Sequence, residues 1–303
     1  MLGSNVSTVG GIQNAFIQAK LWDCDCIQIY VTPSRKWEVP RRLDSAISDF
    51  TNAWAGSRTS AIVAHVPFLV NLASPDDGVR MRSISRLATE IDAAGELGID
   101  LVVLHPGSYR YGSKHEGLIR IVEGLSEAIN KAQSTKPRIL LETMAGQGTS
   151  LGSTFEEMRY LLDTVVERKR VGVCFDTCHV YASGYDMRGY SGYERTMNEL
   201  DAVLGLQSVL AFHLNDSKGK CGSHLDRHCS IGQGHLGLEA FHALLSDRRF
   251  NRLPKIVENP DRDRMSNEDL QLLRGLLSTK ERLVDVPSEA ADTEKKQLDI
   301  FGP

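Results

Sequence analysis

The chain has 303 residues, of which 41% are hydrophobic and 24% are charged. This is the composition of an ordinary globular protein, and the length suits one large core or two small ones. The formal net charge of −4 excludes a protein that holds nucleic acid by its overall charge, so any such contact must be local.

The sequence also argues against a membrane protein and against a secreted one. No apolar run approaches the roughly 20 residues of a membrane span, and the N-terminus lacks the basic-then-apolar pattern of a signal peptide. The six cysteines form no C-x-x-C pair, which indicates reduced thiols and argues against thiolate zinc sites. We therefore expect a cytoplasmic protein without membrane association.

Short apolar runs alternate with longer amphipathic stretches along the chain, with turn residues between them. Eight strands are predicted, at residues 2–6, 26–31, 60–64, 101–104, 138–141, 171–175, 208–212 and 254–257. Eight helices are predicted, at residues 11–20, 43–54, 76–97, 116–133, 154–168, 193–204, 238–246 and 267–277. This alternation implies parallel pairing, and eight units match the α/β class and a closed (β/α)8 TIM barrel.

Side chains that bind metals stand where six consecutive predicted strands end. They are His65, His105, Glu142, Asp176, His213 and Glu258. In such a barrel these positions converge on one mouth, which is the face where barrel enzymes place their chemistry. The sequence therefore predicts a metal site at this mouth.

Three more candidate ligands lie beyond the strand ends. His179 follows Asp176 by three residues, and Asp226 and His228 lie in a Gly-rich stretch, residues 219–237. Any single histidine of the set is more readily explained as a hydrogen-bonded core residue, and a strand-terminal aspartate as a helix N-cap. Nine such residues at one rim make coincidence improbable for the set.

The charge of the predicted site favours more than one ion. Its four carboxylates bring about −4, which one divalent ion leaves uncompensated, whereas three ions bring about +6 and leave a net positive pocket. Such a pocket suits a phosphodiester. Imidazole-rich ligation favours zinc over magnesium, and manganese or iron at one position stays open.

Five motifs in this order resemble the endonuclease IV family, whose members are trinuclear zinc apurinic/apyrimidinic endonucleases built on a TIM barrel. The motifs are His105-Pro106-Gly107-Ser108, Leu141-Glu142-Thr143-Met144-Ala145-Gly146-Gln147-Gly148, Asp176-Thr177-Cys178-His179, His213-Leu214-Asn215-Asp216-Ser217-Lys218 and Asp226-Arg227-His228-Cys229-Ser230-Ile231-Gly232. The resemblance covers roughly residues 2–278.

The resemblance implies three zinc ions per chain and a role for each ligand. Glu142 would bridge two ions; the first is completed by His65 and His105, the second by Asp176, His213 and Glu258, and the third is held by His179, Asp226 and His228. The implied reaction is hydrolysis of the phosphodiester 5′ to an abasic deoxyribose in double-stranded DNA, with removal of 3′-blocking groups at the same site. Glu142 and Glu258 would be the catalytic carboxylates, the latter orienting the attacking nucleophile.

The resemblance also implies DNA-binding residues in two loops, namely Arg35, Trp37, Phe68 and Leu69. These are placed to enter the duplex beside a flipped-out abasic nucleotide. Ordinary core packing is the alternative for Trp37, Phe68 and Leu69. The chain departs from the family pattern at Phe68, where Tyr is expected, and at Asn5, where His is usual.

The sequence changes character after Leu283. We predict a barrel domain at residues 1–283 and a flexible polar tail at residues 284–303. The tail ends in Gln297, Leu298, Asp299, Ile300 and Phe301, which resemble the peptide by which bacterial repair proteins dock on the DNA polymerase sliding clamp. A meaningless frayed terminus is the alternative. The peptide hints at a bacterial, nucleoid-associated repair protein, and a monomer is expected.

Two other functions compete with this prediction. Metal-dependent sugar isomerases and epimerases share this barrel and a strand-end metal site, but typically use one or two ions, so the group of His179, Asp226 and His228 argues against them. A DNA-binding scaffold without catalysis has no need of nine ligands.

Overall fold

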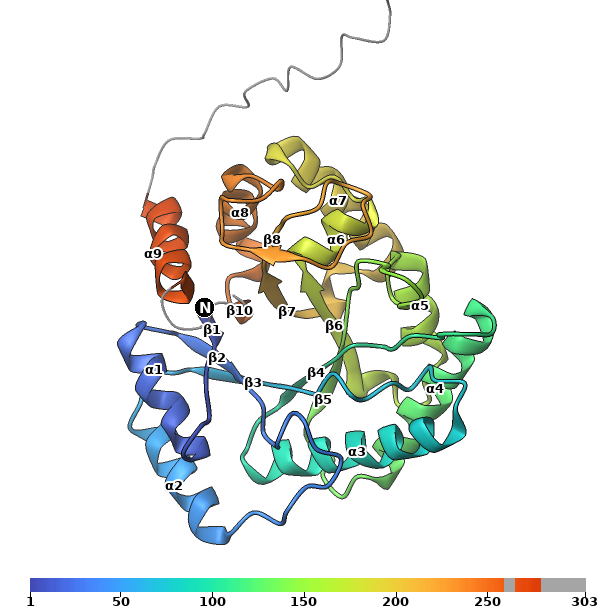
Figure 1. Cartoon of the computed structure of the whole chain (residues 1–303). Helices are drawn as coiled ribbons and strands as arrows, with labels where there is room; N and C mark the ends of the chain where they lie inside the picture. Colours follow the sequence, from blue (N-terminus) through green and yellow to red (C-terminus); the bar gives the residue numbers. More distant parts are fainter. Residues whose placement is uncertain (259–264, 279–303) are drawn as a thin grey trace, which may run out of the picture.

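The strands form one closed barrel surrounded by helices (Figure 1). A computed structural model describes residues 1–258 and 265–278 of the chain. Eight strands pair in parallel, in the order β1-β10-β7-β6-β5-β4-β3-β2, and close on themselves. They are β1 (Leu2–Asn5), β2 (Cys26–Ile29), β3 (Ala61–His65), β4 (Leu101–Leu104), β5 (Arg138–Glu142), β6 (Val171–Asp176), β7 (Val209–Leu214) and β10 (Lys255–Val257). The predicted TIM barrel is confirmed.

Helices cover the outside of this barrel, with one exception. The helices are α1 (Ala15–Leu21), α2 (Asp44–Ala55), α3 (Asp77–Glu96), α4 (Lys114–Lys131), α5 (Phe155–Thr164), α6 (Thr177–Ser183), α7 (Gly189–Leu204), α8 (Leu238–Ser246) and α9 (Met265–Ser278). The exception is α6, which follows β6 directly and lies at the mouth. The layer closes where α9 meets the first helix, since Arg274 of α9 donates to the backbone oxygen of Trp22 at 3.2 Å. In the described part of the chain, no helix is long and apolar enough to cross a membrane.

Side-chain caps explain where several helices begin. The Asp76 carboxylate accepts from the backbone N–H of Val79 and caps α3, and Thr154 caps α5 through the N–H of Glu157. Ser113 and Glu116 form a reciprocal capping box at the start of α4. These caps stand one residue before the helices, which is why the predicted starts of these three helices were close.

The prediction was wrong at three helices and missed several short elements. The predicted helix at residues 11–20 begins only at Ala15, after a 3₁₀ turn (Ile12–Asn14), because Gly11 has φ +143° and cannot continue a helix. The predicted helix at 193–204 begins four residues earlier, and that at 154–168 ends at Thr164. The missed elements include α6 and a two-stranded ribbon formed by β8 (Asp216–Ser217) and β9 (His228–Cys229).

The barrel interior is filled by one apolar side chain from each of β3 to β7. These residues are Val63, Val103, Leu140, Cys174 and Ala211, all fully buried. A second and larger core lies between the barrel and its helices. Because side chains alternate along a strand, residues two positions beyond the interior layer also point into the barrel, one level nearer its mouth.

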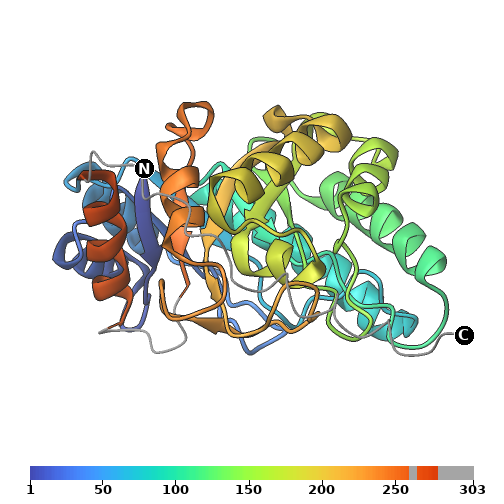
Figure 2. The same ribbon diagram turned by 90° about the horizontal axis from the view of Figure 1, so that it is seen from above.

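The carboxyl ends of the strands meet at one edge of the molecule. Figure 2 shows this edge in side view, with the β8–β9 ribbon (orange) along it. The predicted tail at residues 284–303, its boundary at 283 and the peptide from Gln297 to Phe301 lie outside the described residues.

Candidate metal centre

Five of the predicted ligands stand two residues beyond the interior apolar layer. His65 follows Val63 in this way, His105 follows Val103, Glu142 follows Leu140, Asp176 follows Cys174 and His213 follows Ala211. Strand alternation turns all five side chains into the barrel mouth. On five consecutive strands, therefore, an interior apolar residue is followed by one intervening residue and then by a ligand.

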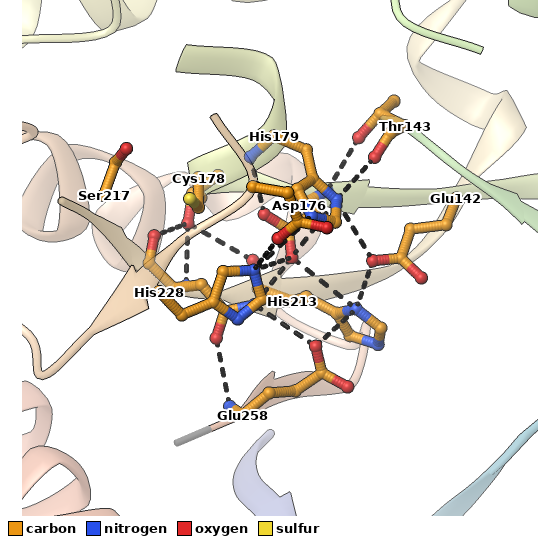
Figure 3. A network of polar contacts seen from close by, with 12 residues as sticks. Glu142, Thr143, Asp176, Cys178, His179, His213, Ser217, His228 and Glu258 are labelled. Carbon is orange, nitrogen blue, oxygen red and sulfur yellow. Dashed lines mark hydrogen bonds and ion pairs between the residues drawn. The ribbon is translucent and has the colours of Figure 1, made fainter. Parts of the chain in front are cut away.

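Glu142 divides its two oxygens between four histidines, and Figure 3 shows the side that faces His179 and His213. Oε2 is 3.0 Å from His105 Nε2 and 3.3 Å from His65 Nε2. Oε1 is 3.0 Å from His213 Nδ1 and 3.3 Å from His179 Nδ1. The carboxylate is fully buried, so it faces its partners without competition from water. This is the arrangement of a bridging ligand.

A second group forms where β6, β7 and β10 end. Ligand atoms of Glu142, Asp176, His213 and Glu258 lie within 4.8 Å of one another. His213 Nδ1 is 3.2 Å from Glu258 Oε2 and 3.8 Å from Asp176 Oδ2. The side chain of Glu258 is 19% exposed whereas those of Asp176 and His213 are fully buried, so Glu258 is the member of this group nearest to solvent.

A third group joins α6 to the β8–β9 ribbon. His179 Nε2 lies 3.2 Å from Asp226 Oδ1 and 3.4 Å from His228 Nε2, and His228 Nε2 is 3.5 Å from the same carboxylate oxygen. The sequence predicted Asp226 and His228 on a loop. In the structure His228 lies in β9, where it pairs with Ser217, so a β-ladder fixes its backbone.

The hydrogen bonds of three histidines orient them for a metal ion. His65 Nδ1 lies 2.8 Å from the backbone oxygen of Val66, His179 Nδ1 lies 2.9 Å from that of Thr143, and His213 Nε2 lies 2.8 Å from Gln28 Oε1. An oxygen acceptor requires the proton on that ring nitrogen, which leaves the lone pair on the other nitrogen, facing the carboxylates. Nitrogen lone pairs and carboxylates facing one another fit a cation between them.

The pKa shifts in the metal-free chain also favour a cation at this centre. Burial lowers the pKa of His179, but Asp176, Asp226 and Glu142 outweigh it and raise that pKa well above the ordinary value. Burial raises the pKa of Glu142, but His213 and His105 bring it well below the usual range. The pKa of Asp226, which burial alone would raise, falls to about 2 because of His179 and His228. Positive charge is therefore strongly favoured among these carboxylates.

Cys178 is the sulfur that lies in one cluster with two of these ligands. Its Sγ lies near Asp176 and His228, but the thiol donates to the backbone oxygen of Arg227 at 3.8 Å, and burial raises its pKa to about 12. A thiol that holds its proton is a poor ligand. The nitrogen and oxygen donors therefore make the better set, as the sequence predicted.

The centre has a buried floor and an open rim. Glu142, Asp176 and His213 are fully buried, whereas the side chains of His105 and Asp226 are 34% and 37% exposed. A ligand from solvent can therefore reach the centre only from the rim. This is the face on which the predicted DNA-binding loops begin.

The predicted DNA-binding residues differ in their environments. Phe68 is 70% exposed, so core packing does not explain it. Leu69 is half-buried and packs against the main core. Arg35 is exposed, while Trp37 is half-buried with the Arg82 guanidinium 4.9 Å from its ring centre. The core-packing alternative thus holds for Leu69 and fails for Phe68.

Sequence reasoning missed two polar residues that hold the ligands. Gln28, buried in β2, accepts from His213 and donates to Glu258 Oε1 at 2.5 Å. Asn215 donates to Asp176 Oδ2 at 2.6 Å and accepts from the backbone N–H of Glu258. A glutamine between two isoleucines in an apolar strand was the available signal for Gln28. Asn215 lies within a motif already singled out.

Comparison with known proteins decides among the families that share this barrel. A family model described as a xylose isomerase-like TIM barrel matches residues 16–276. The probable endonuclease 4 of Trichlorobacter lovleyi is 38% identical over 277 residues, which cover 91% of this chain and 99% of that protein. The chain belongs to the endonuclease IV family. The probable endonuclease 4 of Chloroflexus aurantiacus is likewise 37% identical, over 91% of this chain and 97% of its own.

Solved structures agree with this assignment. Endonuclease IV from Thermus thermophilus superposes with a TM-score of 0.81 at 30% identity and covers 91% of this chain and 98% of its own. A D-tagatose 3-epimerase-like protein superposes with a TM-score of 0.71 at 21% identity, a level that shows the shared fold alone. The chain is an enzyme of the endonuclease IV type. That family is metal-dependent, and the clustered groups at the barrel mouth are able to bind metal.

Proposed function

We propose that this endonuclease IV family member hydrolyses the phosphodiester 5′ to an abasic deoxyribose in double-stranded DNA. The products are a 3′-hydroxyl and a 5′-deoxyribose phosphate. Removal of 3′-phosphate and other 3′-blocking groups uses the same site, because both reactions hydrolyse a phosphate ester and need the same metal assistance. The observation that carries this proposal is the third ligand group, His179, Asp226 and His228, which a sugar isomerase with one or two ions does not need.

Each ligand group accounts for one zinc ion. His65, His105 and Glu142 would hold the first, Glu142, Asp176, His213 and Glu258 the second, and His179, Asp226 and His228 the third. Three divalent ions bring about +6 against about −4 from the carboxylates, which leaves a positive pocket suited to a phosphodiester. Manganese or iron in place of one zinc fits the same donors.

The protein's part in the reaction is to bind and orient. Zinc, when bound, supplies Lewis acidity, which stabilises charge on phosphate oxygens and makes water acidic enough to ionise near neutral pH. Glu142 keeps two sites at a fixed separation through its two oxygens. Glu258, at the open side, orients the attacking water, while Gln28 and Asn215 fix its own two oxygens. No side-chain nucleophile is needed.

The loops around the rim would hold the duplex. Phe68 is exposed and apolar, as a wedge between bases requires, and Arg35 is an exposed cation beside the same mouth. Trp37 and Leu69, both half-buried, would contact the duplex from the same two loops. The protein would act as a monomer, with residues 1–283 forming the catalytic domain and the peptide from Gln297 to Phe301 docking on a sliding clamp.

The test is incision of a duplex oligonucleotide that carries one tetrahydrofuran abasic analogue, with metal content measured on the same preparation. Cleavage 5′ to the lesion with about three metals per chain, lost in Glu142→Ala, supports reaction and site together. A fully metallated protein that leaves this duplex intact contradicts the proposal. Free and phosphorylated sugars would then be the substrates to test.

A further inference from the structure

A buried ion pair on α3 stands outside the metal centre. Arg86 and Glu90 lie one helical turn apart, are 2% and 0% exposed, and meet through Arg86 Nε and Glu90 Oε1 at 2.7 Å. Burying two charges is unfavourable unless their remaining hydrogen-bonding groups are satisfied. The other partners of this pair therefore indicate what it holds in place.

The remaining N–H groups of Arg86 donate hydrogen bonds to the loop between β2 and α2. An Arg guanidinium has five N–H groups in a planar fork. Beyond the bond to Glu90, Arg86 donates to the Thr32 hydroxyl, to the backbone oxygen of Pro33 at 3.0 Å, and to those of Lys36 and Trp37, the latter at 3.2 Å. All five N–H groups thus have acceptors, and four of these acceptors lie in residues 32–37.

Two further arginines attach the same loop to α3. The guanidinium of Arg82, one turn before Arg86, lies over the Trp37 ring. At the far end of the loop, Arg42 donates to the backbone oxygen of Ala93 at 3.4 Å and pairs with Glu96 at 3.5 Å. The loop is the blue trace that leads to α2 in Figure 1. Its conformation is therefore set by α3.

The loop connects this helix with the metal centre. It leaves β2 just after Gln28, which contacts two ligands, and the ring of Tyr30 lies 5.7 Å from that of His65. The side chains of Arg35 and Lys36 are exposed, although the backbone oxygen of Lys36 is held from beneath. An ordered backbone thus presents exposed cations beside the mouth of the barrel.

We propose that Arg86 is a positioning residue for DNA binding, because it holds residues 32–37 in the conformation in which Arg35 meets the duplex. The inference rests on the proposed function. A loop that is already ordered loses little conformational entropy on binding, whereas a loop that is competent only part of the time weakens the apparent affinity by that fraction. Arg86 therefore acts on the affinity for DNA and leaves the chemical step at the metals unchanged.

The test variant is the double substitution Arg86→Met with Glu90→Leu. Removing both charges leaves neither buried alone, and such replacements of buried ion pairs are often neutral or stabilising, so the variant is expected to fold. The matched control is Arg159→Met with Asp163→Leu on α5, an i,i+4 pair at the surface whose arginine also donates to a backbone oxygen, that of Val203. Arg86→Lys is the second variant, because lysine keeps the charge and lacks the fork that reaches several carbonyls.

Two readouts are needed, one with DNA and one without. Steady-state incision of the abasic-analogue duplex should show KM raised about tenfold or more, kcat within about twofold and metal content unchanged in the Arg86 variants. Limited trypsin digestion should show cleavage after Arg35 and Lys36 accelerated about tenfold or more, because opening of the loop exposes the backbone. The control should match the parent protein in both.

The outcomes separate this inference from the proposed function. If the parent protein cuts abasic DNA and the Arg86 variants have the same KM as the parent, the positioning role is overturned. The same holds if the variants lose kcat while their KM stays unchanged. Unchanged trypsin cleavage also overturns it, because the loop is then held by other contacts. If the parent protein does not cut abasic DNA, the proposed function fails, and the digestion still decides whether Arg86 orders the loop.

Discussion

Asp176 and His179 are joined twice, through different oxygens of one carboxylate. Oδ1 accepts from the backbone N–H of His179 at 2.8 Å and caps α6, whereas Oδ2 lies 3.8 Å from Nδ1 of the same imidazole and 2.6 Å from the Asn215 amide nitrogen. The sequence offered an N-cap and a metal ligand as alternatives for Asp176. In the structure the residue caps the helix with one oxygen and faces the proposed ligands with the other.

Asp176→Asn separates these two roles. Asparagine caps a helix as well as aspartate does, but it contributes a neutral, weaker ligand. We expect the cap to survive, but the new amide N–H faces the Asn215 amide donor, so the metal-free protein should lose some thermal stability. Bound metal should fall by about one ion per chain and incision about 100-fold or more. Asp176→Ala should in addition lose about 1 kcal/mol of stability with the cap. Equal metal content in the Asn variant and the parent would contradict the ligand role.

The metal-free and metal-loaded proteins should respond to pH with opposite sign. Without metal, the pKa values of His105, His179 and His213 lie above the ordinary 6.5, because nearby carboxylates, and at His213 first of all Cys174, outweigh burial. A raised folded-state pKa gives stability that is complete below pH 6.5 and is lost as the pH rises through the raised values. Metal binding instead requires these imidazoles without their protons, so the loaded protein gains stability over the same range.

Thermal unfolding from pH 6 to pH 9 measures this difference. With a chelator present, Tm should fall over this range, and with excess zinc it should rise or stay level. Two parallel curves would mean that the histidines do not bind the added ion.

Gln28→Leu tests a residue that touches two ligands without being one. Its loss frees the ring of His213 to take the other tautomer and releases Glu258, and changes of this kind typically weaken metal binding 10- to 100-fold. We expect this weakening in a competition titration with a chromophoric chelator, and lower incision at limiting zinc that excess zinc restores. Gln207→Leu, at an exposed position outside the centre, is the control. A Gln28 variant that excess zinc does not rescue would place the defect elsewhere.

Asp216 holds the ribbon that carries His228. Its fully buried carboxylate accepts from the backbone N–H groups of Ser217, Gly232, Gly234 and Leu236, at 2.8 to 3.1 Å. Asp216→Ala leaves these donors unsatisfied, so we expect a loss of about 3 kcal/mol or more in the free energy of unfolding, measured by urea denaturation. Bound metal should fall toward two ions per chain, because Asp226 and His228 are no longer fixed. Full metal retention would show that the ribbon orders itself without Asp216.

Removal of residues 284–303 tests the proposed tether. A tether raises the local concentration of the enzyme at a clamp without taking part in the reaction. Incision of naked abasic DNA should therefore be unchanged by the deletion, and binding to a purified sliding clamp should disappear in surface plasmon resonance. If the deletion abolished incision of naked DNA, the tail would belong to the catalytic domain.

The barrel and its strand-end residues were predictable because both depend on local pattern. Buried parallel strands read as apolar runs, so a charged or imidazole side chain at the end of each run, as at His105 and Glu142, stands out. The β8–β9 ribbon did not stand out, because its two-residue strands are stabilised by Asp216 and by pairing across ten intervening residues rather than by their own propensity.

The polar residues that support the site were harder to predict for a related reason. Gln28 meets His213 across 185 positions, and Arg86 meets Trp37 across 49, so no short-range periodicity reports these contacts. Gln28 is a polar residue in an apolar strand, and Arg86 is an arginine on the buried face of α3. Such a residue indicates that a partner exists, but only the fold shows which partner it is.

The ligands lie two residues beyond the interior layer, so the metal centre depends on the register of each strand. Deleting one residue between Leu140 and Glu142 would swing the carboxylate out of the lumen and into the helical layer, while the apolar pattern of the strand would survive nearly intact. Deleting a pair would preserve the inward face and lower the ligand by one level. Variation in the length of these strands is therefore permitted in even steps and forbidden in odd ones.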